Sequence, residues 1–364
     1  MPPALKPPKG PNPERKGHRV PTFSADTLRD VAVRILKAAG VPAGEATIVA
    51  DLLVDSNLAG HDSHGILRLR QYLGMIRDGA IFPGAPSKIV QETPATAVLD
   101  GGWGFGQVVA RRAVELSIQK ARTSAVGAVA VRCCNHIGRL GAYAALPCEA
   151  GMVGLLLVNG HGGDQGVAPY GGLARRLGTN PFAAAVPSAG GPPVVMDITT
   201  SIVAGGKIRL ARARGESVPE GCLIDAHGNP ATDPNVYYDP PRGALLPFGG
   251  HKGYGLSVMI DLLAGTLSGA GASAPGSPRP GNAFLAIAID IERFIPVDTF
   301  REEVRQFIAY LKTSPKAPGV AEILAPGERA FRERERRLRE GIEVEDRTWE
   351  QVLDAARSLG VELP

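Results

Sequence analysis

The sequence is poor in aromatic residues and in cysteine, and it has no long apolar run. Phenylalanine, tryptophan and tyrosine make up 5% of its 364 residues, whereas glycine and proline are frequent. This composition favours closely packed backbones and many turns over ligand binding by stacking on aromatic side chains. No stretch reaches the roughly 18 consecutive apolar residues of a membrane-spanning helix. The first residues also lack the apolar segment of a secretory signal. We therefore expect a soluble protein without a membrane partner.

The chain has four cysteines, and their spacing matches no metal-binding or redox motif. Cys133 and Cys134 are adjacent, and Cys148 and Cys222 stand alone. No C-x-x-C pair occurs, so the spacing argues against a zinc site and against a disulfide framework. We expect reduced thiols in a cytoplasmic protein.

Net charge is almost absent outside the first twenty residues. The formal net charge of +4 is carried by residues 1–20, and the rest of the chain is neutral overall. The segment MPPALKPPKGPNPERKGHRVP is rich in proline and poor in apolar residues, which predicts a disordered basic arm over residues 1–22. We do not expect a nucleic-acid partner, because the positive charge is confined to this arm.

Apolar periodicity beyond the arm predicts an α/β protein with helical ends. Three N-terminal helices are expected, the third capped by Ser63 and ended by Gly79. From about residue 95, short apolar runs alternate with helical stretches, which is typical of a sheet covered by helices. The expected helices span 24–39, 44–59, 64–77, 107–122, 138–150 (kinked at Pro147) and 252–268 (largely buried), and the last 65 residues are expected to be helical. The expected strands are TAVLDG, VGAVAVR, MVGLLLVNG, PFAAAVPS, PPVVMDIT and AFLAIAID.

Neither of the two glycine-rich stretches matches a common nucleotide-binding motif. GGWGFG at 101–106 and GGHKGYG at 249–255 lack the spacing of a Rossmann fingerprint and of a P-loop. The first is typical of a tight turn. The second precedes a helix, so its N–H groups and Lys252 fit either an anion such as a pyrophosphate or a plain helix entry.

The stretch GHDSHGILRLR at 60–70 concentrates two of the seven histidines at a predicted helix–helix joint. It allows three interpretations: a metal site, a proton-transfer site or a polar turn. His61-x-x-His64 with Asp62 resembles metal-ligand spacing, which leaves a metal-dependent hydrolase as a remote alternative. No clear third ligand follows in the sequence, so we predict no metal.

Several strings in order resemble one family. They are GHDSHGILRLRQYL, CNHIGRLGAYA, VAPYGGLARRLGTNPFAAAVP, VVMDITTSIVAGGKI, VPEG, DAHGNPATDP, LLPFGGHKGYGLSVMIDLLAGTLSGA and APGE…REGI. Together they are similar to the malate/L-lactate dehydrogenase family of the second type, which includes malate, sulfolactate and ureidoglycolate dehydrogenases, diketogulonate reductase and piperideine/pyrroline-2-carboxylate reductases. The resemblance spans about residues 25–360. It implies a layered mixed-sheet fold that binds NAD(P) without a Rossmann domain, and a homodimer.

The resemblance also implies a division of the chain. After the arm, residues 23–90 form an N-terminal helical segment that packs with the C-terminal region. Residues 91–270 form an NAD(P)-binding α/β domain, and residues 271–364 form a strand and a C-terminal helical segment.

The resemblance also implies roles for individual residues, at the positions of this sequence that match the motifs of the family. The family's catalytic histidine falls on His64, its arginine on Arg68, and the aspartate of its D-x-A-T-S string on Asp197, where Thr199 replaces alanine. Ser63 can cap a helix and also touch substrate. The implied nicotinamide-nucleotide contacts are Asn135, His136, Gly138, Thr179, Asn180, Pro181, Asp197, Thr199, Lys252 and Gly253. Of these, His136 is the second candidate for the proton carrier.

These residues suit the reduction of a 2-oxo acid or the oxidation of a 2-hydroxy acid. Histidine exchanges a proton near neutral pH, and the planar guanidinium of Arg68 can hold a carboxylate through two hydrogen bonds. Because a C=N bond needs the same donors, reduction of a cyclic or N-alkyl 2-imino acid is the alternative. The cofactor is NAD or NADP, with a slight preference for NADP being accepted because Arg175 and Arg176 could meet a 2′-phosphate.

Overall fold

A computed structural model describes residues 20–162, 165–275 and 279–363. Most of the predicted arm, residues 1–19, lies outside the described residues. At the end of the predicted arm, Thr22–Phe23 forms strand β1 and pairs with β12 (Ile342–Glu343).

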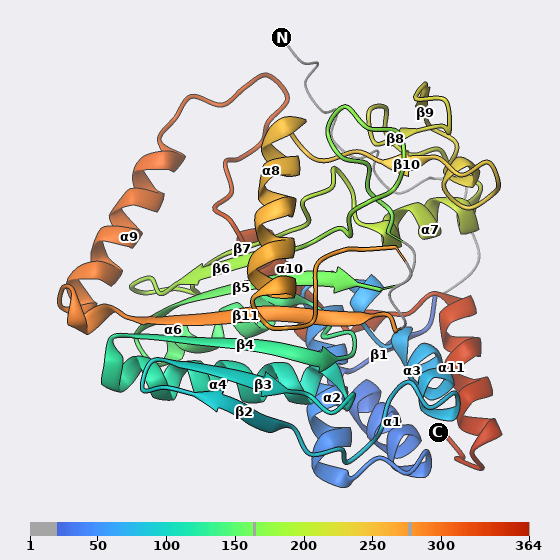
Figure 1. Ribbon diagram of the computed structural model, residues 1–364, viewed down its shortest axis with the longest axis horizontal. Helices are drawn as coiled ribbons and strands as arrows, with labels where there is room; N and C mark the ends of the chain where they lie inside the picture. Colours follow the sequence, from blue (N-terminus) through green and yellow to red (C-terminus); the bar gives the residue numbers. More distant parts are fainter. Residues whose placement is uncertain (1–19, 163–164, 276–278, 364) are drawn as a thin grey trace.

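The centre of the molecule is a seven-stranded mixed sheet in the order β2-β3-β4-β11-β5-β6-β7 (Figure 1). Strands β3 and β4 run parallel, and the other neighbours are antiparallel. The layered mixed-sheet prediction is confirmed, and all six expected strands are present. The strands are β2 (Lys88–Glu92), β3 (Thr96–Asp100), β4 (Val126–Cys134), β5 (Met152–His161), β6 (Phe182–Val186), β7 (Val194–Ile198) and β11 (Gly281–Asp290).

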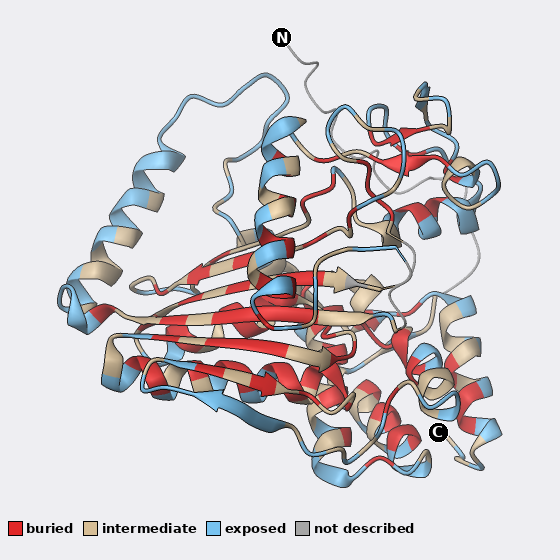
Figure 2. Cartoon of the chain, viewed as in Figure 1, coloured by how far each residue is buried: buried red, intermediate tan, exposed pale blue. Residues whose placement is uncertain are grey.

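Helices cover both faces of this sheet (Figure 1). On one face lie α4 (Gly106–Ser124), α5 (Leu140–Ala144) and α6 (Leu146–Glu149), which pack on β4, β5 and β6. On the other lie α8 (His251–Ile260) and the π-helical turn η3 (Asp261–Thr266), which contact β5 and β11. The buried residues in Figure 2 accordingly follow the sheet and the inner side of α4.

The N-terminal helices share a core with the C-terminal end of the chain. Helices α1 (Ala25–Ala38), α2 (Ala43–Leu58), α3 (Arg68–Arg77) and α11 (Asp346–Ser358) contribute to one apolar cluster. Ser24 caps α1 by accepting a hydrogen bond from the N–H of Thr27 at 3.0 Å, as expected. The four-part division of the chain stays a prediction.

A smaller lobe and two further helices complete the described chain. The lobe contains α7 (Gly205–Arg214), η2 (Pro234–Tyr237) and a sheet of β8 (Leu223–Ile224), β9 (Pro230–Ala231) and β10 (Ala244–Leu245). A short 3₁₀ turn, η4 (Ile291–Arg293), leads to α9 (Val297–Lys312), which has no buried residue; α10 (Glu328–Glu340) packs on α2. Among the described residues, no helix is both long and apolar enough to cross a membrane.

The third predicted helix, 64–77, is wrong at its start. Residues Asp62–His64 instead form a 3₁₀ turn, η1, and α3 begins only at Arg68. Asn57 explains the break: its Oδ1 accepts a hydrogen bond from the N–H of Ile66 at 2.8 Å, and a Cβ at Gly65 would lie 2.3 Å from its amide group. Asn57 therefore holds Gly65 in an extended conformation, so Ser63 is not a helix cap and His64 does not share a helix with Arg68.

Two other predicted helices also differ. The expected helix 138–150 is divided at Ala145, and Pro147 lies in the first turn of α6, where a missing N–H costs nothing. The expected helix 252–268 ends at Ile260 before η3, and it is not largely buried in the single chain, because Met259, Leu262 and Leu267 are exposed.

Candidate active site

Two histidines that are 72 residues apart in the sequence meet beside η1. The rings of His64 and His136 stack with their centroids 5.3 Å apart and their planes 9° from parallel. Burial, followed by the charge of Arg68, lowers the pKa of His64 to about 3 and that of His136 well below its usual value. Both imidazoles are therefore neutral at pH 7, the form in which a histidine can accept a proton.

Tyr72 helps to fix the orientation of His136. Its hydroxyl accepts a hydrogen bond from Gln107 Nε2 at 2.6 Å and lies 2.9 Å from His136 Nδ1. A phenol oxygen donates one hydrogen bond and accepts up to two, so this chain of contacts holds Nδ1 of His136 with either tautomer of the ring. By contrast, Nδ1 of His64 has no hydrogen-bond partner among the described residues.

Arg68 is a buried cation beside this pair. Its side chain donates through Nε to the carbonyl of Ser63 at 2.7 Å and through a terminal nitrogen to Gln71 Oε1 at 2.5 Å. Only 8% of the residue is exposed, and burial lowers its pKa. Both of these acceptors are neutral, so the described residues supply no carboxylate to balance its charge. Such a cation favours an anionic ligand.

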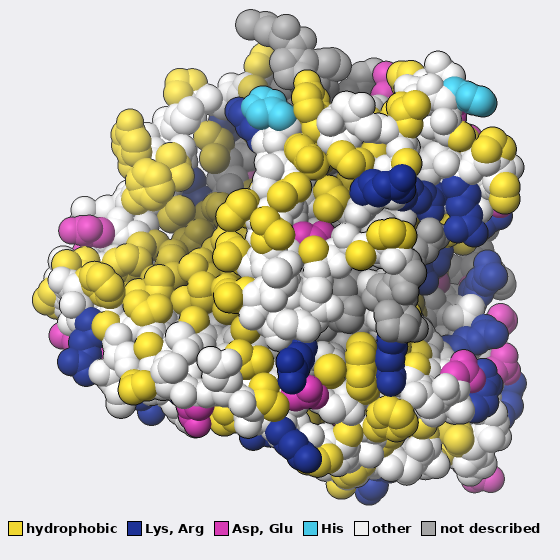
Figure 3. Space-filling view, viewed as in Figure 1, with side chains coloured by type: hydrophobic (Ala, Val, Ile, Leu, Met, Phe, Trp, Pro, Cys, Tyr) yellow, Lys and Arg dark blue, Asp and Glu magenta, His cyan; other side chains and the backbone are white. Residues whose placement is uncertain are grey.

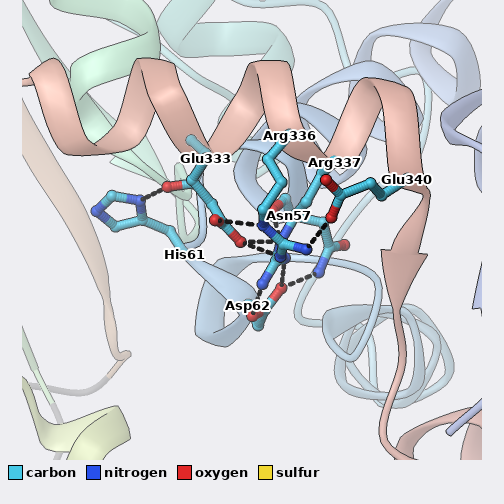
Figure 4. Close-up of polar contacts among 8 residues, drawn as sticks. Asn57, His61, Asp62, Glu333, Arg336, Arg337 and Glu340 are labelled. Carbon is cyan, nitrogen blue, oxygen red and sulfur yellow. Dashed lines mark hydrogen bonds and ion pairs between the residues drawn. The ribbon is translucent and has the colours of Figure 1, made fainter. Parts of the chain in front are cut away.

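The η1 turn is held in place by α10. Arg337 forms a two-point ion pair with Asp62, at 2.6 and 3.1 Å, and donates to the carbonyl of Asn57 at 2.6 Å (Figure 4). Asn57 Nδ2 donates to the same Asp62 carboxylate at 2.6 Å. Asp62 is therefore an anchor between α2 and α10, which fixes the backbone immediately before Ser63 and His64.

A cavity of about 1690 Å³ opens next to η1. It is larger than the roughly 300–1,000 Å³ of a small-ligand pocket. Several of its arginines are ion-paired, as Arg139 is with Asp55 at 2.7 Å. Lys207 and Arg329 line the cavity without an ion-pair partner among the described residues, which suits a ligand with phosphate groups.

Asp197 and His61 connect this cavity to the histidine pair. Both line it, and Asp197 Oδ2 accepts a hydrogen bond from the N–H of Gly141 at 2.7 Å. Burial and then Arg139 lower the pKa of His61, against a raising contribution from Asp197. The charge of Asp197 thus acts on His61, for which the sequence offered a turn or a remote metal-ligand role, while His61 in turn acts on His64.

The predicted cofactor contacts Asn135 and Gly138 flank His136 in the sequence, and the structure gives each of them a role in holding the backbone. Asn135 Nδ2 donates to the carbonyls of Ala80, Trp103 and Gly104 at 2.8–3.0 Å. This fixes the GGWGFG turn, where Trp103 has a φ of 58°. Gly138 has a φ of 87°, a conformation that favours glycine.

The remaining predicted contacts gather at a joint between β6, β7 and α8, and none of them lines the cavity. The buried side chain of Asn180 donates to Ser257 and to Asp261 Oδ2 at 3.0–3.1 Å. The carbonyl of Thr179 accepts from Thr200, and Gly253 N–H donates to Phe248. Pro181 and Thr199 flank the β6–β7 pairing at Phe182 and Ile198, and Lys252 is exposed.

No group of three or more histidine, cysteine, aspartate or glutamate side chains in the described residues is placed to hold a metal ion. His61 Nδ1 lies 3.0 Å from the carbonyl of Ala59. The four cysteines are free.

Comparison with known proteins identifies the family. The family model described as malate/L-lactate dehydrogenase matches residues 23–353. The chain belongs to this family. It is 39% identical to a malate dehydrogenase of Pyrococcus horikoshii, covering 93% of this chain and 95% of that protein. It is 41% identical to an L-sulfolactate dehydrogenase of Methanothermobacter thermautotrophicus, covering 90% and 94%.

Solved structures agree with this membership. A malate/lactate dehydrogenase from E. coli superposes with a TM-score of 0.88 at 37% identity, over 95% of this chain and 96% of that one. A Δ1-piperideine-2-carboxylate reductase from Pseudomonas syringae superposes with a TM-score of 0.81 at 32% identity, over 92% and 100%. The family fold and oxidoreductase class are thereby shown for this chain.

Sequence reasoning missed Tyr72, Gln107 and the cavity role of His61. Tyr72 lies four residues after Arg68 in the quoted stretch, and His61 belongs to the H-x-x-H spacing, so both stood inside the stretch that carried the signal. Gln107 gave none.

Proposed function

We propose that this member of the family is an NAD(P)-dependent oxidoreductase that interconverts a small 2-hydroxy acid and the corresponding 2-oxo acid. The observation that supports it is the neutral His64–His136 pair beside a buried Arg68 that has no carboxylate partner among the described residues. When bound, NAD(P) accepts or supplies the hydride at the substrate carbon.

The residues of the chain perform the remaining steps. Arg68 binds the substrate carboxylate, and neutral His64 takes the hydroxyl proton as the hydride leaves C2. His136, held by Tyr72 through Nδ1, carries its hydrogen on Nε2 in this proposal and donates a hydrogen bond to the substrate oxygen. In the reverse direction, the negative charge of the substrate raises the pKa of His64 and lets it carry the proton.

A substrate screen tests this proposal. NADH and NADPH oxidation would be followed with pyruvate, oxaloacetate, a 2-oxo acid plus methylamine, and piperideine-2-carboxylate. We expect turnover with a plain 2-oxo acid. Absence of turnover with every substrate, together with no NAD(P)H binding by fluorescence, would overturn it.

The alternative is reduction of a cyclic or N-alkyl 2-imino acid. It is favoured by the structural similarity to a piperideine-2-carboxylate reductase. Turnover with piperideine-2-carboxylate but not with plain 2-oxo acids would select it.

Cofactor preference is tested in the same screen. Acceptance of NADP stays our proposal, but Arg175 does not support it. Its Nε donates to the carbonyl of Gly243 at 2.7 Å, its guanidinium lies over the Tyr237 ring, and neither it nor Arg176 lines the cavity.

We also propose a homodimer in the cytoplasm. An exposed apolar groove lies between α8 and α9, where hydrophobic side chains gather in Figure 3. The exposed apolar side chains of these elements include Met259 on α8, Leu262 on η3, and Phe307 and Tyr310 on α9. The free thiols agree with a reducing compartment; cell fractionation tests the location.

A further inference from the structure

Arg68 is not the only cation directed at the histidine pair. Helix α7 approaches η1 closely, since a Cβ added at Gly206 would lie 3.4 Å from Ser63 Cβ. Arg209 follows Gly206 by three residues, so the two share a face of α7. Its charge acts on His64, Arg68 and His136. Arg209 therefore lies on the face of α7 that approaches η1, within electrostatic reach of the pair.

Arg209 is not committed to another structural contact. It is exposed and has no ion pair or hydrogen bond among the described residues. Its neighbours on α7 differ, because Arg212 pairs with Asp239 at 2.9 Å and Arg214 pairs with Glu345. An unpaired arginine next to a second uncompensated arginine is unfavourable without an anion.

Among the residues that the structure describes, no carboxylate acts on His64 to balance this positive charge. The charged groups that act on His64 are Arg68, His61, Arg139 and Arg209. Asp62 is occupied by Arg337 and Asn57, and Asp197 accepts from Gly141. The pair is thus faced by two arginines, one buried on α3 and one exposed on α7, which suits a ligand with two separated negative charges.

We propose that Arg209 is a specificity-determining residue that binds the distal acid group of a doubly charged substrate, while Arg68 binds the carboxylate next to the reacting carbon. The inference rests on the proposed function and names its substrate class. The protein accordingly prefers a 2-oxo acid with a second carboxylate or a sulfonate over a monocarboxylate. Arg209 takes no part in the hydride or proton transfer.

Steady-state kinetics of Arg209→Gln test the assignment. We expect kcat/KM for oxaloacetate to fall by about tenfold to a hundredfold, as for loss of a charged hydrogen bond, while that for pyruvate changes by less than about threefold. Arg209→Lys should recover part of the loss, because it keeps the charge but not the planar fork. Sulfopyruvate, measured beside oxaloacetate, shows which distal acid is preferred.

Arg214→Gln is the matched control, since it removes the same charge from the same helix at a surface pair with Glu345. It should leave the oxaloacetate-to-pyruvate ratio unchanged. An equal loss with both substrates in Arg209→Gln would overturn the proposal. So would a rise confined to the KM of NADH or NADPH, which would assign Arg209 to the cofactor.

Binding measurements separate this proposal from the proposed function. Calorimetry would compare malate with lactate on wild-type protein and Arg209→Gln. If no substrate turns over, yet wild type binds malate more tightly than lactate and the variant does not, the role of Arg209 stands and the proposed reaction fails. Equal affinities of wild type for malate and lactate would refute the role of Arg209.

Discussion

At the scale of single residues, the two stacked histidines differ in what they can do. His136 is tied through Nδ1 to Tyr72, which is tied to Gln107. His64 has no such partner on Nδ1 among the described residues. The histidine whose nitrogen is not held by a neighbour is free to exchange a proton. This difference favours His64 as the proton carrier and His136 as an oriented hydrogen-bond donor.

Replacing His64 tests this division of roles. His64→Asn should lower kcat by at least about a hundredfold, the usual contribution of a general acid–base, and leave the Kd of NAD(P)H unchanged. Stopped-flow and fluorescence titration would measure the two quantities. Exposed His227→Asn is the control. An unchanged kcat would exclude proton transfer by His64.

The lowered pKa of His64 predicts an unusual pH profile. Oxidation of a 2-hydroxy acid needs neutral His64, so activity is lost as pH falls through its pKa. Because burial and Arg68 lower this pKa from 6.5 to about 3, kcat/KM should show no acid limb near pH 6.5. The profile for hydroxy acid oxidation between pH 5 and 9 would show it. A limb near 6.5 that disappears in His64→Asn would contradict the prediction.

At the scale of elements, the site depends on a turn that helix α10 holds in place. Residues of α2, η1 and α10 meet at Asp62; Arg337 donates two hydrogen bonds to its carboxylate and a third to the carbonyl of Asn57 (Figure 4). The same helix pairs Arg334 with Asp55, which also binds Arg139. Helix α10 therefore couples the turn that carries His64 to the wall of the cavity.

Breaking this anchor should affect both stability and catalysis. Arg337→Met leaves the half-exposed Asp62 without its cation, and we expect a loss of about 1–3 kcal/mol, less than for a fully buried pair, together with a fall in kcat. Urea unfolding and steady-state assays would measure these effects.

Arg336→Gln is the control for Arg337→Met, because the ion pairs of Arg336 within the described chain are with Glu333 and Glu340 on its own helix. Such pairs contribute less than about 1 kcal/mol. Equal effects of the two variants would contradict a special role of Asp62–Arg337.

At the scale of the whole molecule, the groove between α8 and α9 is the feature that a single chain does not explain. Helix α9 has no buried residue although Phe307 and Tyr310 lie on it, 58% and 71% exposed. Figure 2 shows this helix in the exposed and intermediate colours and apart from the sheet. Large exposed apolar surfaces of this kind mark interfaces, which fits the proposed homodimer.

Placing a charge on α9 tests this interface. Tyr310→Glu should shift the mass in solution from twice 38.0 kDa to 38.0 kDa, because a carboxylate buried at an apolar interface is strongly unfavourable. Light scattering after gel filtration would measure the mass. Val90→Asp, at an exposed apolar residue of strand β2, is the control and should leave the mass unchanged. A monomeric wild type would refute the interface.

Local features of the chain predicted much of its architecture. Apolar periodicity and the Ser24 cap placed the helices of residues 24–39 and 44–59, and short apolar runs placed six strands of the central sheet, since these signals depend on neighbours in sequence. The ordered motifs indicated the family and singled out His64 and Arg68. The boundary errors arose where a distant residue intervened, as Asn57 does at Gly65.

The sequence by itself determined the elements, the family and the residue types available for chemistry. Only the tertiary structure decided which of these residues act together. It stacked His64 on His136, linked His136 through Tyr72 to Gln107, placed Asp197 beside His61, and brought Arg209 from another lobe toward Arg68. These pairings depend on how the helices pack on the sheet, and they join residues that lie many tens of positions apart in the sequence. The spacing of residues within a short stretch cannot show such contacts.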